Sequence, residues 1–395
     1  MTQSDVSPPA LSLTELFLKF LRFGLLAFGG PVAQIAMIRE ALVDDERWIS
    51  SARFNRLLAV LQVLPGPEAH ELCVHLGMVA RGRWGGLLAG LGFMLPGFLL
   101  MLGVAWLYES WIAGQLGAGA AFLGIQIVIL AVIARAVAKI GSHILVDRLL
   151  WLIAAVCFAA TLAGASFWIP LLAAGLCYAF AKRPVIVVAV AALATLLAIA
   201  LASNSGAARA PIVAASGAAT TFALFLAGLK GGLLTFGGAY TAIPYVRDDT
   251  VGRGWLSDGV FLDGVALAGI LPAPLVIFAT FAGFVAGGWA GALAITAGMF
   301  LPAFAFSMIF FERLEQIAEH PGLHRLLAGV AAAVVGVIAA TLVELGASTA
   351  DRVSTVEVGL ALFVVALGIA WLWKSKLAVP GLIMVGGLAG WHFLG

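Results

Sequence analysis

The sequence predicts an all-α protein that crosses a membrane many times and contains two homologous repeats with broken or re-entrant helices. Of its 395 residues, 63% are hydrophobic and only 11% are charged, whereas charged residues make up about a quarter of a soluble domain. Apolar runs of about 20 residues, the length that spans a bilayer, recur along the whole chain. In addition, a motif containing Phe-Gly-Gly occurs once in each half.

The apolar runs give about thirteen membrane segments, not all of them full spans. Their approximate centres are residues 25, 66, 96, 128, 157, 173, 194, 234, 271, 300, 334, 364 and 386. We divide the chain into an N-terminal repeat with extra membrane segments, residues 1–205, and a C-terminal repeat, residues 206–395. The stretch between about 145 and 203 carries no motif that we can interpret, and we expect it to join the halves in the required orientation.

The repeat becomes visible when the chain is shifted against itself by 208 residues. Cations, glycine pairs and arginines then coincide: Arg22 with Lys230, Phe28-Gly29-Gly30 with Phe236-Gly237-Gly238, and Arg39 with Arg247. After a slip of one residue, the triplet Pro65-Gly66-Pro67 falls on Pro272-Ala273-Pro274. The match covers about residues 17–108 and 225–311, so the chain is a fused duplication.

A proline pair interrupts an apolar segment in each half. Proline removes a backbone donor and disfavours helix in the residue before it, so we predict two half-helices that meet at each break. The free N–H groups and positive dipole end of the following half-helix suit an anion. Because duplicated transporters bind substrates at such broken helices near the midplane, the pattern favours a transporter. The alternative is a pair of kinks that only aid packing.

Other matched residues have two interpretations each. Arg22 and Lys230 lie within apolar segments and suit an anion shared between the halves, although long cationic side chains also extend to the interface. The glycine pairs either permit close helix packing or open backbone N–H groups to a ligand. Arg39 and Arg247 lie beside acids at segment ends, where a loop ion pair, a topology signal and a gate all fit.

Only the first copy carries ionisable residues behind its break. Glu68, Glu71 and His75 are spaced by three and four residues and share one helical face. An anion site beside ionised carboxylates is unfavourable until they are protonated, so we predict that this face couples protons to transport. The alternative is that Glu68 complements the helix dipole and that His75 is a hydrogen-bonded interior histidine.

Several other site classes are disfavoured. Cys73, Cys157 and Cys177 are odd in number and have no paired spacing, which argues against a disulfide framework or a metal cluster. His70 and His75 are five residues apart, whereas the zinc-protease motif needs four. The chain has no nucleotide-binding glycine pattern, and its net charge of +2 is too small to imply a nucleic-acid partner. We therefore expect no cofactor, no metal and no nucleic acid.

Phe-Gly-Gly-Pro followed by Gln34 and Arg39-Glu40, Leu-Pro-Gly-Pro-Glu-Ala at 64–69, and a second Phe-Gly-Gly after Lys230 resemble the long, two-domain form of the chromate ion transporter family. The resemblance implies a multi-pass inner-membrane protein that exports chromate, with sulfate as a look-alike oxyanion, and halves of inverted topology. The second break departs from the Pro-Gly-Pro of many members. The resemblance places the substrate site on Arg22, Phe28, Gly29, Gly30, Gln34, Pro65, Gly66, Pro67, Glu68, Lys230, Phe236, Gly237, Gly238, Pro272 and Pro274.

The sequence thus predicts a secondary transporter, not an enzyme, that exports chromate and is driven by the membrane potential, by proton exchange or by both. A dianion leaving a cell that is negative inside gains roughly 4.6 kcal/mol per 100 mV, twice the single-charge value. The alternatives are a sulfate or other anion permease, and an intramembrane enzyme that uses Glu68, Glu71 and His75 as acid and base groups. The expected partners are chromate, sulfate as a competitor and the lipid bilayer. The sequence leaves open whether the protein forms a homodimer.

Overall fold

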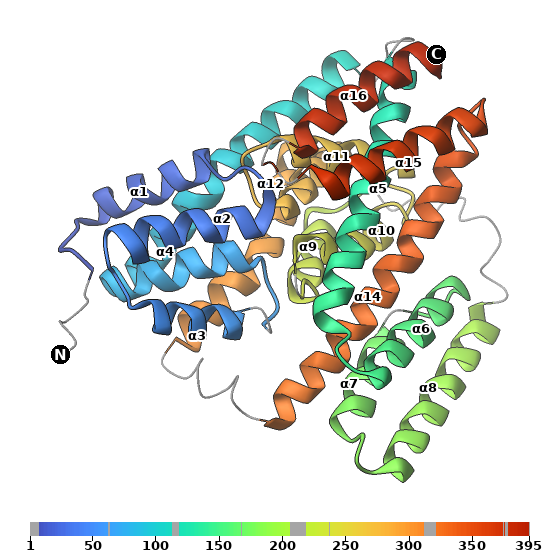
Figure 1. Cartoon of the computed structure of the whole chain (residues 1–395), viewed down its shortest axis with the longest axis horizontal. Coiled ribbons are helices and arrows are strands. Elements are labelled where there is room, and N and C mark those ends of the chain that lie inside the picture. The colour runs from blue at the N-terminus through green and yellow to red at the C-terminus, as the bar shows by residue number, and fades with distance from the viewer. Residues whose placement is uncertain are drawn as a thin grey trace.

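The computed structural model describes residues 8–61, 64–112, 118–166, 168–205, 219–236, 238–311, 321–373, 375 and 378–394. These residues form helices and connecting segments without any strand, which confirms the predicted fold class (Figure 1). Four helical stretches in this part of the chain are long and apolar enough to cross a membrane: Glu68–Ser110, Gly119–Ile144, Leu275–Ile309 and Arg325–Ala350. The other apolar helices are shorter, and one of them, Thr221–Leu233, ends just before the second Phe-Gly-Gly motif.

The helices of the first repeat are α1 Leu13–Leu25, α2 Gly30–Arg39 with its continuation η1 Glu40–Asp45, α3 Ser51–Leu61, α4 Glu68–Leu107 with η2 Tyr108–Ile112, α5 Ala118–Ile144, α6 Arg148–Leu162 and α7 Trp168–Ala179. Helix α8 spans Pro184–Ser205. The second repeat contains α9 Thr221–Leu233, η3 Ala239–Ala242, α10 Ile243–Thr250, α11 Asp258–Ile270, η4 Leu275–Ile277, α12 Phe278–Ile309, α14 Pro321–Ala350, α15 Val356–Leu372 and α16 Ala378–Phe393. The elements correspond in order, and α8 is the additional helix between them.

Helices α4 and α12 each reverse direction at the same place in the repeat. The backbone angles are φ −143°, ψ 29° at Arg81 and φ 61°, ψ −153° at Gly82. At the matching residues they are φ −150°, ψ 23° for Gly287 and φ 60°, ψ −154° for Gly288. A left-handed φ favours glycine at the second position of both turns. The duplication in sequence is therefore also a duplication in backbone conformation.

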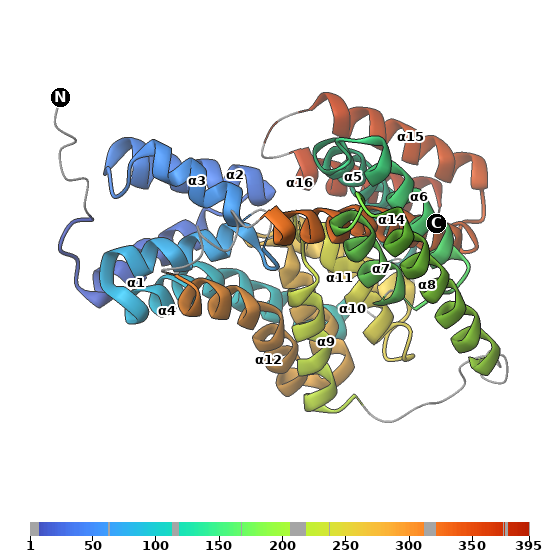
Figure 2. The same cartoon turned by 90° about the horizontal axis from the view of Figure 1, so that it is seen from below.

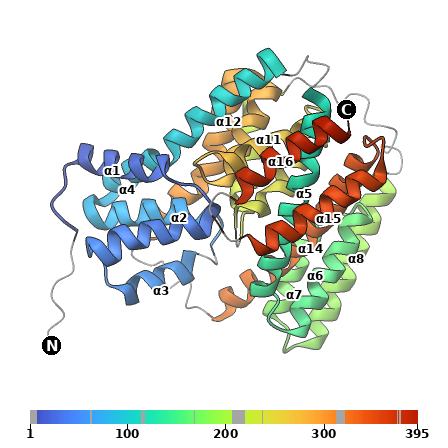
Figure 3. The same ribbon diagram turned by 45° about the horizontal axis from the view of Figure 1, so that its top comes forward.

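The long helices α5 and α14 exchange their partners between the repeats. Helices α6 and α7, which follow α5, pack on α14, whereas α15 and α16, which follow α14, pack on α5 (Figure 3). Figure 1 shows α5 and α14 running in opposite directions, and Gly141 near the end of α5 lies against Val335 in the first half of α14. Equivalent helices that run antiparallel are what an inverted repeat produces.

The exchange of partners explains what the helices within residues 145–203 do, a stretch whose sequence carries no recognisable motif. Within residues 145–203, α6 and α7 are counterparts of α15 and α16, and they cover α14 of the other repeat. Figure 2 shows α1–α4 grouped on one side of the molecule, with one arm of α12 beside α4. This contact between α4 and α12 brings the two proline breaks toward each other.

Glycines bring the first helix of each repeat against the second arm of its hairpin. A Cβ at Gly92 would lie 2.7 Å from the Phe17 carbonyl oxygen on α1, and one at Gly298 would lie 2.7 Å from the Leu229 nitrogen on α9. At Gly24 and Gly232 an added Cβ would meet Pro96 at 3.0 Å and Pro302 at 3.1 Å. Gly24 and Gly232 therefore permit close packing of α1 and α9 against these arms.

We expect Gly298→Leu to destabilise the protein because the larger side chain must push α9 away from α12. Overpacking of this kind costs about 1–3 kcal/mol or more. The control is Gly103→Leu, since Gly103 is a helical glycine of α4 with no heavy atom within 4 Å of an added Cβ. Thermal unfolding in detergent checks the prediction, and equal melting temperatures for the two variants would contradict it.

Candidate substrate site

The two proline breaks separate half-helices as predicted. Helix α3 ends at Leu61 and α4 begins after Pro67, while α11 ends at Ile270 and η4 begins after Pro274. All six residues of the two triplets are buried. Gly66 has φ +148°, whereas Ala273 has no positive φ. Alanine is thus tolerated in the second triplet because the backbone there does not need glycine.

Each break contacts the Phe-Gly-Gly segment of the other repeat. The Gly66 N–H donates to the Thr235 carbonyl over 2.9 Å. Conversely, Gln34 Nε2 donates to the Ala27 carbonyl over 2.8 Å and to the Ala273 carbonyl over 3.0 Å. Ala27 and Thr235 are equivalent positions, each directly before the phenylalanine of its motif. Two breaks and two motifs from distant parts of the sequence therefore converge into one region built by both repeats.

The helices that begin at these motifs have no side-chain cap within the described residues. The N-cap of α2 is Gly29, at φ 88°, and the N-cap of α4 is Pro67. In the second repeat Gly238, at φ 135°, precedes η3, and Pro274 precedes η4. In contrast, the starts of four other helices are capped by side chains: Ser12 for α1, Asp147 for α6, Thr220 for α9 and Ser257 for α11.

Uncapped helix starts leave backbone N–H groups at the positive end of the helix dipole. The N–H groups at the start of α4 lie in the buried region where the breaks converge, whereas α2 begins beside it at Gly29, which is exposed, so both sets are available to an anion. Gly30, at φ +77°, has open space within 4 Å of an added Cβ. Phe236 is buried and Phe28 is 37% exposed. Gly237 lies outside the described residues.

The proton-coupling candidates lie directly behind the first break. Glu71 is completely buried, and neither of its carboxyl oxygens has a hydrogen-bond partner among the described residues. Its carboxyl carbon would lie 2.9 Å from a Cβ added to Gly66. Glu68 is buried one turn earlier, and the His75 ring lies 4.6 Å from the ring of Phe311. A buried carboxylate without partners is unfavourable as an ion.

His70 is a buried titratable residue that sequence reasoning examined only as part of a zinc motif. Its ring lies between Phe300 and Phe304 of α12, with centroid distances of 4.9 and 4.7 Å. Ser307 of α12 donates to the Glu71 carbonyl over 3.4 Å. The first arm of α4 therefore packs against the second repeat through its histidines and its backbone. His/Cys/Asp/Glu clusters able to hold a metal are absent from the described residues.

The matched cations Arg22 and Lys230 have different surroundings. Lys230 forms ion pairs with Asp248 at 3.0 Å and Asp249 at 2.7 Å, and its side chain is 16% exposed. Arg22 is exposed on α1. In the first repeat the positions of the two aspartates are taken by Glu40 and Ala41. The duplication thus preserves a positive charge at this position but not the pair of aspartates that binds Lys230 in the second repeat.

Arg39 and Arg247 lie at equivalent positions in the last turns of α2 and α10. Arg247 binds Asp258 at the start of α11 over 2.7 Å and Glu344 of α14 over 2.6 Å. Arg39 donates to Ser51 at the start of α3 over 3.0 Å. Both arginines therefore hold one helix end to the beginning of the next, Arg247 through close ion pairs and Arg39 through a serine hydroxyl, with Asp44 only 3.9 Å away.

Arg247→Ala is expected to destabilise the fold more than Arg39→Ala. Removal of Arg247 leaves two partly buried carboxylates without their cation, at a cost of about 1–3 kcal/mol. Arg39 is 42% exposed, and an exposed pair is worth less than about 1 kcal/mol. The two melting temperatures measured under one condition check this order. Equal losses would show that Arg247 is not the stronger restraint.

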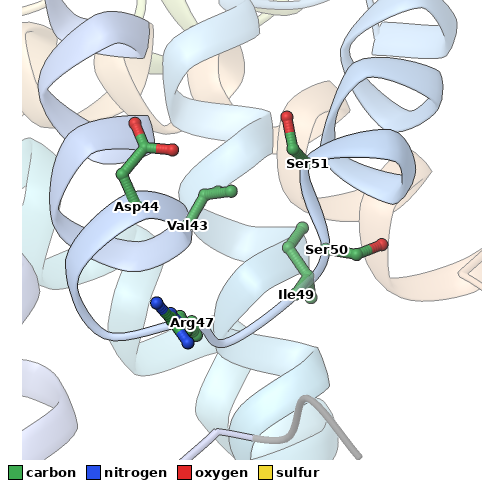
Figure 4. Close-up of a pocket in the computed structure, with 6 residues that line it drawn as sticks. All are labelled: Val43, Asp44, Arg47, Ile49, Ser50 and Ser51. Carbon is green, nitrogen blue, oxygen red and sulfur yellow. The ribbon is translucent and has the colours of Figure 1, made fainter. Parts of the chain in front are cut away.

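A surface pocket of about 330 Å³ lies at the start of α3, lined by Val43, Asp44, Arg47, Ile49, Ser50 and Ser51 (Figure 4). The Pro-Gly-Pro break follows the other end of the same helix, which is 11 residues long. At 1.5 Å per residue this is a separation of about 16 Å. The pocket is therefore distinct from the region where the breaks converge.

Comparison with known proteins agrees with this arrangement. The sequence profile of the family described as Chromate transporter matches residues 14–223 and again residues 222–391. The chain belongs to the chromate transporter family. It is 57% identical over 392 residues to a chromate transport protein of Pseudomonas aeruginosa, covering 98% of this chain and 94% of the relative. A chromate transport protein of Cupriavidus metallidurans is 31% identical, covering 97% of this chain and 93% of the relative. No solved structure matches.

The family match and the apolar helices establish a membrane protein whose two repeats are both members of one family. The relatives are named as transport proteins. Among the residues of this transporter that sequence reasoning missed is Asp263 on α11, which is buried and accepts hydrogen bonds of 2.7 Å from Tyr108 and from Gln126. A single acid in an apolar segment was the signal that could have found it.

Proposed function

We propose that this member of the family exports chromate across the inner membrane, through a site shared by the two repeats. The single observation that carries the proposal is the reciprocal contact between each break and the other repeat's Phe-Gly-Gly segment. Gly66 bonds to Thr235, and Gln34 bonds to Ala273. A site held by both halves can be exposed to either side when the halves move against each other, which is how inverted-repeat transporters work.

The expected substrate contacts are backbone N–H groups at the starts of α2 and α4, with Gln34 holding the two repeats in register. The relatives' names supply chromate as the substrate. Sulfate shares its charge and tetrahedral shape, so a sulfate permease is the second candidate. Outward movement follows the membrane potential, because each negative charge that leaves gains about 2.3 kcal/mol per 100 mV.

Glu68, Glu71 and His75 are proposed to couple protons to this movement. Glu71 lies against Gly66 in the first break, so its charge acts directly on an anion bound there. Binding of a proton removes a negative charge from the site and thereby favours the anion. The buried position of Glu71 without described hydrogen-bond partners supports its role as a group that gains and loses a proton.

Transport by inverted membrane vesicles tests the proposal. Vesicles that contain the protein are expected to accumulate radiolabelled chromate when their interior is positive, and control vesicles without it are not. Collapse of the potential and collapse of the pH gradient in parallel samples separate the two driving forces. Uptake of sulfate without chromate would replace the proposed substrate, and uptake of neither anion would contradict the transport proposal.

We expect Lys230→Ala to reduce chromate uptake at least tenfold, since it removes the described cation of Asp248 and leaves Asp249 with Arg253 alone near the second motif. A variant that also carries Asp248→Asn and Asp249→Asn separates two roles of the lysine. It stays inactive if Lys230 contacts chromate, and it regains uptake if Lys230 serves only its ion pairs. Uptake at equal expression, measured in the same vesicles, provides the comparison.

A further inference from the structure

The amide of Gln34 has a fixed orientation. Its Nε2 lies 2.8 Å from the Ala27 carbonyl and 3.0 Å from the Ala273 carbonyl. Only the NH₂ end of an amide can donate to two carbonyl oxygens, and both of its hydrogens are then used. The free end is therefore Oε1, an acceptor, which is buried and has no partner within the described part of the chain.

The second side chain with unused polar atoms at the breaks is Glu71. Both of its carboxyl oxygens are buried without described partners, against Gly66. The donors of the region are the backbone N–H groups at the uncapped starts of α2 and α4. The convergence of the two breaks thus offers donors from the backbone and acceptors from the side chains. A buried acceptor that stays unpaired costs free energy.

An anion that carries only acceptor oxygens satisfies the backbone donors, and the hydroxyl of Glu71 when that residue is protonated, but leaves Gln34 Oε1 unpaired. A tetrahedral oxyanion with one proton satisfies both, because its hydroxyl group donates and its other oxygens accept. Chromate takes up one proton near neutral pH. Sulfate and selenate are anions of strong acids and carry none in this range. The acceptors can therefore distinguish anions that have the same charge and shape when deprotonated.

We propose that the form of the substrate bound at the breaks is the hydrogen chromate monoanion, and that Gln34 Oε1 accepts the hydrogen bond from its hydroxyl group. The inference rests on the proposed function, since it takes the converging breaks as the chromate site. It assigns to Gln34 a role in specificity: the residue selects against dianions that have no proton to donate. Loss of one buried hydrogen bond corresponds to a preference of about 10–100-fold.

Protonation of the protein must be separated from protonation of the anion. The titratable groups near the breaks are Glu68, His70, Glu71 and His75 on α4. The positive charge of Arg53 on α3 acts electrostatically on the His75 ring. On α12 the described groups that face them are Ser307 and the rings of Phe300 and Phe304, and Phe311 just after α12 faces His75. Protons bound by α4 affect every anion alike, whereas a proton on the substrate affects chromate alone.

Selenate is the probe that makes this distinction, because it matches chromate in size and in charge but stays deprotonated. Equilibrium binding of radiolabelled chromate to the purified full chain is measured between pH 6 and 8, with selenate and sulfate as competitors. Above the pKa of hydrogen chromate, the apparent affinity for total chromate is expected to fall about tenfold per pH unit. Selenate is expected to compete at least tenfold more weakly than chromate at pH 6.

Two results would overturn the inference. One is competition by selenate as strong as that of chromate, which would mean selection by size and charge. The other is a parallel loss of chromate and selenate binding with rising pH, which would place the proton on the protein. Absence of any chromate binding or uptake would instead contradict the proposed function, so the two failures are distinguishable.

Variants test the named residue. Gln34→Met removes the acceptor at similar volume and is expected to bring chromate and selenate within about threefold of each other. Gln126→Met is the matched control, because Gln126 is also buried with an unpartnered Oε1, but on α5 and bonded to Gly259 and Asp263. It is expected to keep the preference. A retained preference in folded Gln34→Met would refute the role of Gln34, and the wild-type competition decides the inference without any variant.

Discussion

Replacement of Gly66 by alanine is expected to abolish chromate uptake. Gly66 has φ +148°, and an added Cβ would lie 2.9 Å from the carboxyl carbon of Glu71. An L-residue in such a conformation costs about 1–3 kcal/mol. Relief of the strain would move the Gly66 N–H away from Thr235 or displace the Glu71 carboxyl group, and either change alters the site directly. Initial uptake into inverted vesicles is expected to fall at least tenfold.

Two controls separate this effect from a general effect of substitution. Ala273→Gly changes the equivalent position of the second break, where φ is not positive. This variant is expected to keep uptake within about threefold of the wild type, which corresponds to a free-energy change of less than about 1 kcal/mol. Gly103→Ala adds a methyl group to α4 where nothing lies within 4 Å and should be neutral. Wild-type uptake by Gly66→Ala would show that the conformation of the first break is not needed for transport.

Glu71→Gln is expected to remove the response of transport to a pH gradient. The amide keeps the shape of the protonated carboxyl group but cannot gain or lose a proton. With the pH of the bath held constant, so that protonation of chromate itself is unchanged, an imposed pH gradient should therefore change initial chromate uptake by less than about a tenth of its effect on the wild type, while uptake driven by the membrane potential persists. The measurement compares vesicles with each driving force imposed alone.

The control for Glu71 is Glu40→Gln, which removes an exposed carboxylate from the end of the segment that carries the first motif. It is expected to behave as the wild type under both driving forces. If Glu71→Gln responds to the pH gradient as strongly as the wild type, proton coupling must be assigned to other groups, of which Glu68 and His75 share its helical face and Asp263 is buried in the second repeat.

Local rules were enough to predict the fold class, the duplication and the two broken helices. The proline pairs end α3 and α11 because proline cannot continue a helix there, and that cause acts within a few residues. The face formed by Glu68, Glu71 and His75 was predictable for the same reason, since helical spacing is local. The reversal of α4 at Arg81 and Gly82 repeats at Gly287 and Gly288, so the duplication extends to turns as well.

Contacts between the repeats could not be predicted from the sequence. Gln34 bonds to Ala273 across 239 residues of chain, and no spacing rule connects two positions so far apart. The environments of Arg22 and Lys230 also differ despite their alignment, because Asp249 replaces a neutral alanine of the first copy. Packing of α6 and α7 on the other repeat's long helix likewise depends on tertiary structure, which local patterns do not contain.

One chromate site, in this proposal, is built jointly by both breaks. The most direct test is the stoichiometry of radiolabelled chromate bound to the purified protein, for the wild type and for two variants that each alter one break, Gly66→Ala and Ala273→Leu. We predict one chromate per wild-type chain and none above background for either variant, although both remain monodisperse. Two chromates per wild-type chain, or one that persists when either break is altered, would show that each repeat binds the anion by itself and would contradict the account.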